Sequence, residues 1–385
     1  YACQADYADC NGELPDGCEK HLPDDVANCG SCGHVCGAQH ATASCEAGKC
    51  EIVCEAGHAN CDGIDENGCE TDLTGNTNCG ACGHDCKAGQ CNGSMMCDPI
   101  LLGETNTAGS MLTMDSSTLY WKSYDSITSH FAVVKLSKGG GTVGTVGYPS
   151  GDDFGGMAPG DDGIFLSMNW NGALYLLEFS SEQLATKSVP TGVQYGHDVV
   201  RTSQWVFWVA SGGGTQKLFR APHAGGSPTL VWSEAVIQSV AADDQSVYWA
   251  NNSKGEIRSV SHNGTDAKTV GLGAVGATSL THHGTKLYWA TGNGGTVLSV
   301  DKGGGTPTVL VPNGGTPVWG ATSDAGHVWY WSGNEIRRVP NTGGTPMTMA
   351  VGQKDFSGMV SDGEYLYWLS MSNDVTKAYK IAAGP

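Results

Sequence analysis

The stretch that decides the fold is KLYWATGNGGTVLSVDKGGGTPTVLV, residues 286–311. It predicts three strands, at 286–291, 295–302 and 306–311, because β-branched and aromatic runs alternate with glycine turns. The preceding run TSLTH, residues 278–282, predicts a short inner strand of small residues. Four successive antiparallel strands within about forty residues are typical of one blade of a β-propeller.

The aromatic ending of the second strand recurs along the chain and predicts the number of blades. It stands in TLYW, WVFW, SVYW, KLYW, WYW and YLYW, with a weaker copy in GIFL, and the last letters are Trp121, Trp208, Trp249, Trp289, Trp331, Trp368 and Leu166. These copies are 37 to 45 residues apart, a period that predicts a seven-bladed β-propeller. One aromatic per blade at the same position indicates core packing rather than a ligand cage.

The last copy ends before an outer strand, whereas PILLGE, residues 99–104, is a strand without a blade. We expect residues 99–104 to complete the last blade, so that the propeller domain covers residues 99–385. Pairing both ends of the domain would close the ring and remove an open sheet edge. His223 and His262 fall in hairpins between third and fourth strands, where we expect them to be exposed.

The Tyr-Trp repeat resembles that of YWTD-type and NHL-type propellers. In YWAN at Tyr248 and YWAT at Tyr288 the aspartate of the YWTD pattern is missing. This resemblance implies the propeller fold and no particular ligand.

All 16 cysteines lie in residues 1–98, a composition that separates a cysteine-rich domain from the propeller. They form two repeats, residues 3–50 and 54–97, with eight cysteines in the same order. The sets are Cys3, Cys10, Cys18, Cys29, Cys32, Cys36, Cys45 and Cys50, then Cys54, Cys61, Cys69, Cys79, Cys82, Cys86, Cys91 and Cys97. An even count in such short, core-poor units predicts four disulfides per repeat and a secreted, extracellular or cell-surface protein. The pairing stays open.

Each repeat contains the motif NCGSCGHVC or NCGACGHDC, beginning at Asn28 and Asn78. Gly33 and Gly83 separate the second cysteine from the histidine, which argues against a covalent haem site. Zinc would use three thiolates and leave five, an odd number, so disulfides are favoured over zinc. His34 and His84 are then expected to be exposed loop residues.

An acidic turn in the second repeat suggests a calcium site. Its oxygen-bearing side chains are Asn60, Asp62, Asp65, Asn67 and Glu70. Calcium prefers such ligands, although the spacing is not that of an EF-hand. The alternative is a solvated acidic turn in which Asn-Gly and Asp-Gly supply positive φ angles.

The cysteine repeats resemble cysteine-rich modules of secreted proteins from myxobacteria and related delta-proteobacteria. The resemblance covers residues 3–97 and implies an extracellular bacterial protein with no particular chemistry. Of the formal net charge of −19, residues 1–98 carry −14. An acidic chain repels phosphate backbones, so nucleic acid is not an expected partner. The sequence also lacks an apolar run long enough for a transmembrane segment.

Residues that interrupt the propeller repeat are the candidates for ligand binding. They fall in the loops that lead into inner strands and those that join second and third strands: Tyr124, Asp152, Asp153, Phe154, Trp170, Tyr195, His197, Trp319, Asp355 and Phe356. Exposed aromatic rings beside amides and carboxylates suit sugar binding, and ordinary loop composition is the alternative. We therefore expect a glycan or an extracellular protein as partner.

Catalytic motifs give no comparable signal, since neither G-x-S-x-G nor H-E-x-x-H occurs. His197 and Asp198 could form an acid–base pair, and Asp152 and Asp355 could hold a metal. The first hypothesis is a secreted, non-enzymatic binding or structural protein. The alternatives are a propeller hydrolase or lyase with a metal-assisted site in the channel, and a self-associating subunit of an extracellular filament.

Overall fold

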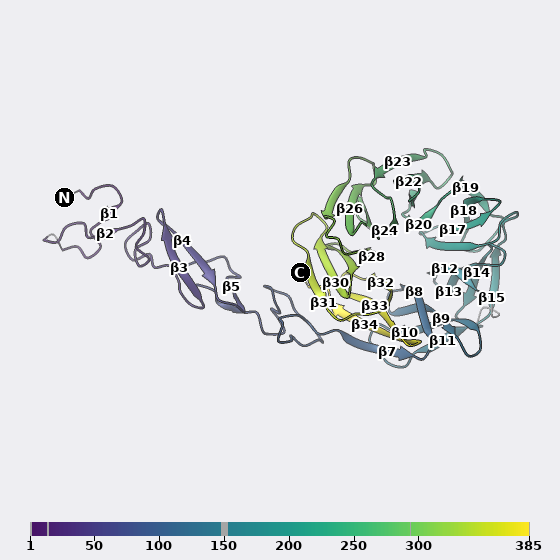
Figure 1. The fold of residues 1–385 in the computed structure, drawn as a ribbon, viewed down its shortest axis with the longest axis horizontal. Coiled ribbons are helices and arrows are strands. Elements are labelled where there is room, and N and C mark those ends of the chain that lie inside the picture. Colours follow the sequence, from purple (N-terminus) through teal and green to yellow (C-terminus); the bar gives the residue numbers. More distant parts are fainter. Residues whose placement is uncertain (1, 14, 148–152, 293, 385) are drawn as a thin grey trace. The chain divides into compact units, whose positions relative to one another are not determined.

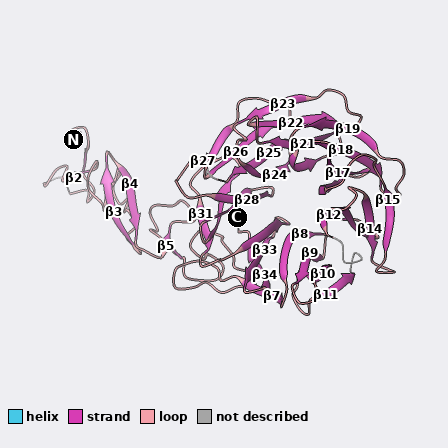
Figure 2. Cartoon of the chain, turned by 45° about the vertical axis from the view of Figure 1, so that its right-hand side comes forward, coloured by secondary structure: helices cyan, strands magenta, loops and turns pink. Residues whose placement is uncertain are grey.

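The structure, a computed structural model, describes residues 2–13, 15–147, 153–292 and 294–384. The chain divides into two compact units, the first reaching Asp98 and the second covering Pro99–Ala383. Figures 1 and 2 show strands, turns and loops over the described residues, with no helix among them. None of those residues therefore belongs to a helix that could cross a membrane. The predicted fold class, a seven-bladed propeller preceded by a disulfide-rich module, is confirmed.

Seven four-stranded antiparallel sheets make up the second unit, and each sheet is one blade. The inner strands are β8 (Ala108–Met114), β12 (Phe154–Pro159), β16 (Gly196–Arg201), β20 (Gln238–Ala242), β24 (Ala277–His283), β28 (Val318–Ser323) and β32 (Phe356–Ser361). The second strands are β9 (Thr118–Asp125), β13 (Gly163–Met168), β17 (Trp205–Gly212), β21 (Ser246–Asn251), β25 (Lys286–Thr291), β29 (His327–Ser332) and β33 (Tyr365–Ser372).

The outer half of each blade is built from a third and a fourth strand. The third strands are β10 (His130–Ser137), β14 (Leu174–Glu178), β18 (Thr215–Pro222), β22 (Glu256–Ser261), β26 (Thr296–Asp301), β30 (Glu335–Pro340) and β34 (Val375–Ala382). The fourth strands are β11 (Gly144–Gly147), β15 (Leu184–Ser188), β19 (Thr229–Glu234), β23 (Lys268–Leu272), β27 (Thr308–Val311), β31 (Met347–Ala350) and β7 (Ile100–Thr105).

The ring is closed by two segments from opposite ends of the unit. Strand β7, the first of the unit, pairs with β34, the last, from Ile100 opposite Lys380 to Thr105 opposite Thr376. It is the outermost strand of the seventh blade, and the inner strands β12 and β32 both contact β8. The blades therefore form an unbroken circle, as Figure 1 shows.

The core consists of one large aromatic side chain per blade packed against the neighbouring blade. Trp121, Trp208, Trp249, Trp289 and Trp368 are fully buried, and Leu166 takes this place in the second blade. The sixth blade differs from the prediction, because Trp331 is partly exposed and stacks on Phe356 at 4.8 Å between ring centroids. There Trp329 and Tyr330 are the buried pair, one residue earlier than the sequence repeat suggested.

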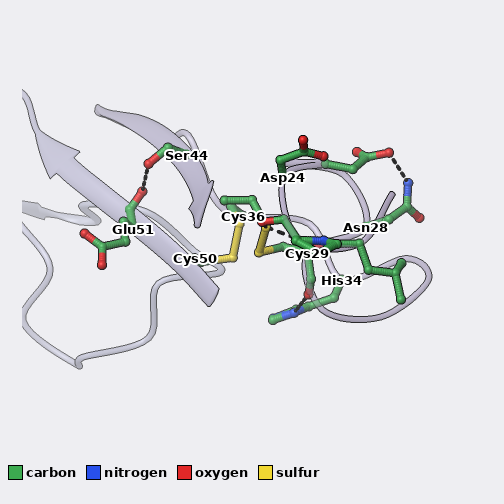
Figure 3. Close-up of a disulfide and its surroundings, with 12 residues drawn as sticks. Asp24, Asn28, Cys29, His34, Cys36, Ser44, Cys50 and Glu51 are labelled. Atoms are coloured by element: carbon green, nitrogen blue, oxygen red, sulfur yellow. Dashed lines mark hydrogen bonds between the residues drawn. A yellow bond between two sulfur atoms is a disulfide. The ribbon is translucent and has the colours of Figure 1, made fainter. Parts of the chain in front are cut away.

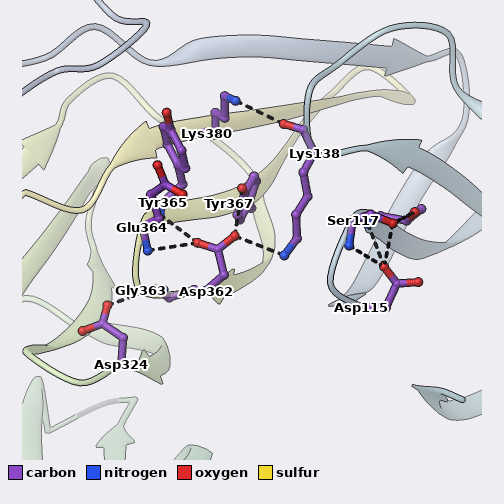
Figure 4. A network of polar contacts seen from close by, with 12 residues as sticks. Asp115, Ser117, Lys138, Asp324, Asp362, Gly363, Glu364, Tyr365, Tyr367 and Lys380 are labelled. Carbon is purple, nitrogen blue, oxygen red and sulfur yellow. Dashed lines mark hydrogen bonds and ion pairs between the residues drawn. The ribbon is translucent and has the colours of Figure 1, made fainter. Parts of the chain in front are cut away.

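An aspartate in the hairpin between first and second strands sets this register. In four blades its Oδ1 accepts two backbone N–H groups and its Oδ2 accepts a donor from the aromatic residue five positions later. The pairs are Asp115 with Tyr120, Asp243 with Tyr248, Asp324 with Trp329 and Asp362 with Tyr367. Figure 4 shows one such turn, where Lys138 also pairs with Asp362 at 3.1 Å. Counted from Asp324, Tyr330 stands where the other blades have tryptophan.

The cysteine-rich unit consists of short hairpins and eight disulfides. Its strands pair as β1 (Tyr7–Ala8) with β2 (Lys20–His21), β3 (Ala41–Glu46) with β4 (Lys49–Cys54), and β5 (His58–Ala59) with β6 (Thr71–Asp72). The disulfides are Cys3–Cys18, Cys10–Cys32, Cys29–Cys45, Cys36–Cys50, Cys54–Cys69, Cys61–Cys82, Cys79–Cys91 and Cys86–Cys97. Both repeats join their cysteines in the same order, first to third, second to fifth, fourth to seventh and sixth to eighth.

The histidine of the repeated motif closes a tight turn through two hydrogen bonds to the first cysteine of the motif. His34 Nδ1 donates to the carbonyl of Cys29 at 2.5 Å, and the Cys29 N–H donates to the carbonyl of His34 at 2.8 Å (Figure 3). His84 makes the same two contacts with Cys79 and is buried. The expected exposure is therefore wrong for His84, which is buried, whereas the His34 side chain is still 36% exposed.

Candidate functional site

The predicted ligand residues occupy one side of the propeller. We call this side the loop face, defined by the loops leading into inner strands and those joining second and third strands. Tyr124, Asp153, Phe154, Trp170, Tyr195, His197, Trp319, Asp355 and Phe356 all belong to it by their positions in or next to those loops. Asp152 lies outside the described residues.

Part of this set serves the fold. Lys122, a buried side chain of β9, forms an ion pair with Asp153 and donates to the carbonyl of Phe154 at 2.7 Å. Asn169 Nδ2 donates to the other oxygen of Asp153 at 2.7 Å. The Phe154 ring is fully buried and cannot stack on a ligand, so its predicted binding role is wrong. A polar residue beside it made Phe154 resemble a loop residue, but it begins strand β12.

Two more aromatic residues have partners within the fold. Tyr124 lies against Phe131, with 4.8 Å between ring centroids. Phe356 is half-buried under Trp331. Asp355 adopts a φ of 47° and its carbonyl accepts the N–H of Met371 at 3.0 Å, so its backbone is held while its side chain is exposed.

Three aromatic side chains remain exposed on the loop face. Trp170 is 54% exposed, Tyr195 is 63% exposed and Trp319 is 42% exposed. Hydrogen bonds hold the backbone at two of them: the carbonyl of Tyr195 accepts the N–H of Ser211 at 2.9 Å, and in the Trp170 loop the Gly172 N–H donates to the carbonyl of Met168 at 3.0 Å. Rigid loops that display large rings lose little conformational entropy when they bind a ligand.

A hollow of about 460 Å³ opens on the loop face. Its lining consists of His197, Asp198, Gln216, Val236, Ile237, Gln238, Ser239 and Thr278. His197 stands between two partners, with Nδ1 3.2 Å from Asp198 Oδ2 and Nε2 3.4 Å from the hydroxyl of Ser211. Within the described residues Thr278 Oγ1 is buried without a hydrogen-bond partner. The lining is thus rich in hydroxyl and amide groups.

A larger hollow, of about 1080 Å³, lies on the opposite side of the ring and was missed in the sequence. It is lined by the far ends of inner strands and by the aspartate hairpins that follow them. Two of its aspartates form ion pairs: Arg201 donates twice to Asp161 at 2.9 Å, and Lys302 pairs with Asp243 at 2.7 Å. The spacing of five residues from aspartate to aromatic was the available signal for these hairpins.

Histidines on that side tie neighbouring strands together. His282 Nε2 donates to the carbonyl of Ala242 at 2.9 Å, and burial together with the Lys302 ammonium lowers the pKa of its imidazole. His223 and His262 donate to the carbonyls of Thr202 and Asp243. Both are half-buried rather than exposed as expected, because these hydrogen bonds draw them against the preceding hairpin.

The acidic turn proposed for calcium forms a network of its own. Asn60 Nδ2 donates to Asp65 at 3.0 Å and Asn67 Nδ2 donates to Asp62 at 2.7 Å. Glu70 accepts the N–H of Cys61 at 2.9 Å. The first repeat has the same arrangement, with Asn11 donating to Asp16 and the Cys10 N–H donating to Glu19. These contacts explain the conserved spacing of the two turns within the chain, and calcium there stays a prediction.

Comparisons with known proteins support the fold. The chain is similar to virginiamycin B lyase from Staphylococcus aureus, with 13% identity, a TM-score of 0.59, and 73% of this chain and 98% of that chain covered. It is also similar to an oligogalacturonate lyase in complex with manganese, with 14% identity, a TM-score of 0.56 and coverage of 72% and 88%. A computationally designed protein matches with 13% identity, a TM-score of 0.53 and coverage of 72% and 99%. No protein-family model and no curated protein matches the chain. At such identities the likeness shows the propeller fold alone.

Proposed function

We propose that the protein is an extracellular binding protein that recognises a saccharide through its loop face. The observation that carries this proposal is the exposure of Trp170, Tyr195 and Trp319, three large rings on the loop face. By contrast, Trp121, Trp208, Trp249, Trp289 and Trp368, which pack between the blades, are fully buried. The exposed tryptophans differ from these in their position in the blade. Eight disulfides suit an oxidising, extracellular environment.

The chemistry of the neighbouring hollow fits the same class of ligand. A sugar ring offers an apolar face to an aromatic side chain and hydroxyl groups at its edge to polar side chains. Ser239, Thr278 and Asp198 in the lining supply hydroxyl and carboxylate groups.

A glycan array followed by calorimetry with the best saccharide tests the proposal. Replacing Trp170, Tyr195 or Trp319 by alanine should weaken binding by roughly 10- to 30-fold at the positions in contact, as expected for aromatic residues at a binding site. Leu230→Ala, an exposed apolar residue on the outer strand β19, is the matched control and should bind like the wild type. Failure of the array and of matrix polysaccharides to bind would contradict the proposal.

One observation favours a second candidate, a hydrolase. Ser211, His197 and Asp198 have the order nucleophile, base and orienting carboxylate, with His197 Nε2 towards the hydroxyl and Nδ1 towards the carboxylate. In this proposal His197 takes the proton of the Ser211 hydroxyl during attack on an ester or lactone. A screen on lactones and polysaccharide esters should detect turnover that Ser211→Ala abolishes; equal turnover in the variant would refute it. Self-association into a filament stays a prediction.

A further inference from the structure

Three metal-binding side chains meet where the two cysteine repeats join. His40 precedes β3, Glu55 follows β4 and His58 begins β5, and their ligand atoms all lie within 4.8 Å of one another. His40 Nδ1 is 3.6 Å from Glu55 Oε2. The two imidazole rings are stacked, with 3.8 Å between centroids and 9° between planes.

The backbone holds these residues in place. The Glu55 N–H donates to the carbonyl of His40 at 2.8 Å, and the His58 N–H donates to the carbonyl of Glu55 at 3.1 Å. Next to them Ala41 pairs with Cys54 in the β3–β4 ladder, and Cys54 is joined to Cys69. Because the disulfides and these hydrogen bonds already order the backbone, only side chains would need to move when a metal ion binds. The loss of conformational entropy on binding would therefore be small.

One buried nitrogen atom of the cluster lacks a hydrogen-bond partner. Among the described residues His58 Nδ1 is buried and finds no hydrogen-bond partner. Buried polar nitrogens are nearly always bonded, and such an exception needs an explanation. A metal ion bound to the cluster would provide one.

A fourth candidate ligand, Asp72, lies on the strand that pairs with β5. Asp72 is directly opposite His58, and directly opposed residues of antiparallel strands present their side chains on the same face. Thr74 donates both its N–H and its hydroxyl to Asp72 Oδ1, at 2.8 and 2.7 Å. Oδ2 is therefore the oxygen that we assign to a ligand role.

We propose that His40, Glu55, His58 and Asp72 bind a zinc ion that clamps the first cysteine repeat to the second. Two imidazole nitrogens and two carboxylate oxygens suit tetrahedral Zn²⁺, and every cysteine of the chain is already in a disulfide. Parallel stacked rings direct their lone pairs side by side, so one ring turns about its Cβ–Cγ bond to bring both onto the ion. This inference does not depend on the propeller.

The test is calorimetric titration of the full chain, disulfides intact, with Zn²⁺ at pH 7.5. One ion should bind with a dissociation constant of about 10 µM or tighter. His58→Gln should weaken binding by about 100-fold and Asp72→Asn by about 10-fold, since each loses one ligand. His21→Gln is the matched control, because His21 lies in the same unit beside Asp24 and outside the cluster. Unchanged affinity in His58→Gln, or no binding by the wild type at about 1 mM Zn²⁺, would overturn the proposal.

If a variant forms its disulfides incorrectly, its zinc affinity is not informative, so a second measurement uses the wild-type protein alone. In the wild-type protein, Zn²⁺ should shift the imidazole C2–H resonances of His40 and His58 and leave that of His21 in place. Shifts of His21 without those of His40 and His58 would contradict the assignment.

Discussion

The contribution of Asp243 to the stability of the propeller can be calculated from its contacts. Its carboxylate lies in the hairpin of the fourth blade and pairs at 2.7 Å with Lys302, which follows the third strand of the fifth blade. The two side chains are 22% and 16% exposed, so solvent screens the pair only partly. Burial opposes ionisation, but Lys302 and the N–H groups of Gln245 and Ser246 outweigh it and lower the pKa of Asp243 from 3.8 to about 2.

This shift corresponds to about 2 kcal/mol of stability, at 1.36 kcal/mol per pKa unit. Since the pKa is lower in the folded state, the contribution is complete above pH 4 and is lost as pH falls through the folded pKa near 2. Asp243→Asn should therefore lower the free energy of unfolding by about 2 kcal/mol at pH 7, and the difference from the wild type should shrink towards pH 2.

Urea unfolding followed by tryptophan fluorescence measures this difference, because all 11 tryptophans lie in the propeller. Asp301→Asn is the control: Asp301 is 63% exposed, and its ion pair with Lys286 spans 3.7 Å. Such a surface pair should change stability by less than about 0.5 kcal/mol. A wild-type-like Asp243→Asn, or a difference from the wild type that stays constant down to pH 2, would refute the reasoning.

Three further predictions concern the fold. Leu102→Ala in β7, a buried position of the strand that closes the ring, should cost about 2–4 kcal/mol in urea unfolding, and wild-type stability would show that closure contributes little. Trp329→Ala should lower the free energy of unfolding by about 3–5 kcal/mol, and Trp331→Ala should lower it clearly less. A larger loss for Trp331→Ala would show that Trp331 is the core residue of the sixth blade, as the sequence repeat predicts. Replacing Cys29 and Cys45 together by serine opens a loop with a sequence separation of 16 and should destabilise the first unit by about 3 kcal/mol. Proteolysis of that unit should accelerate while the tryptophan transition is unchanged, and equal proteolysis rates would contradict this.

The blade count could be predicted because six of the seven blades bury a large aromatic residue in the second strand, and Leu166 takes its place in the second blade. The sixth blade shows the limit of that pattern, since WYW offers two alignments and the sequence repeat favours Trp331. Asp324, five residues before Trp329, resolves the choice, because the aspartate bonds the aromatic ring donor and fixes where the strand begins. This spacing is present in the sequence and could have been used.

Other features depend on contacts that spacing does not reveal. Eight cysteines allow many pairings, and the duplication requires only that both repeats use the same one. Phe154 and Trp170 looked alike in the sequence, but one begins an inner strand and the other lies in a loop. His40 and His58 meet only because the β3–β4 hairpin folds Glu55 back against His40.

The central claim is that exposed rings of the loop face bind a saccharide, and the indole N–H resonances of the 11 tryptophans test it most directly. The saccharide identified by array should be titrated into the labelled protein. The signals of Trp170 and Trp319 should shift on saturation, while those of Trp121, Trp208, Trp249, Trp289 and Trp368 should stay in place. Saturation with neither the Trp170 nor the Trp319 signal moved would contradict it.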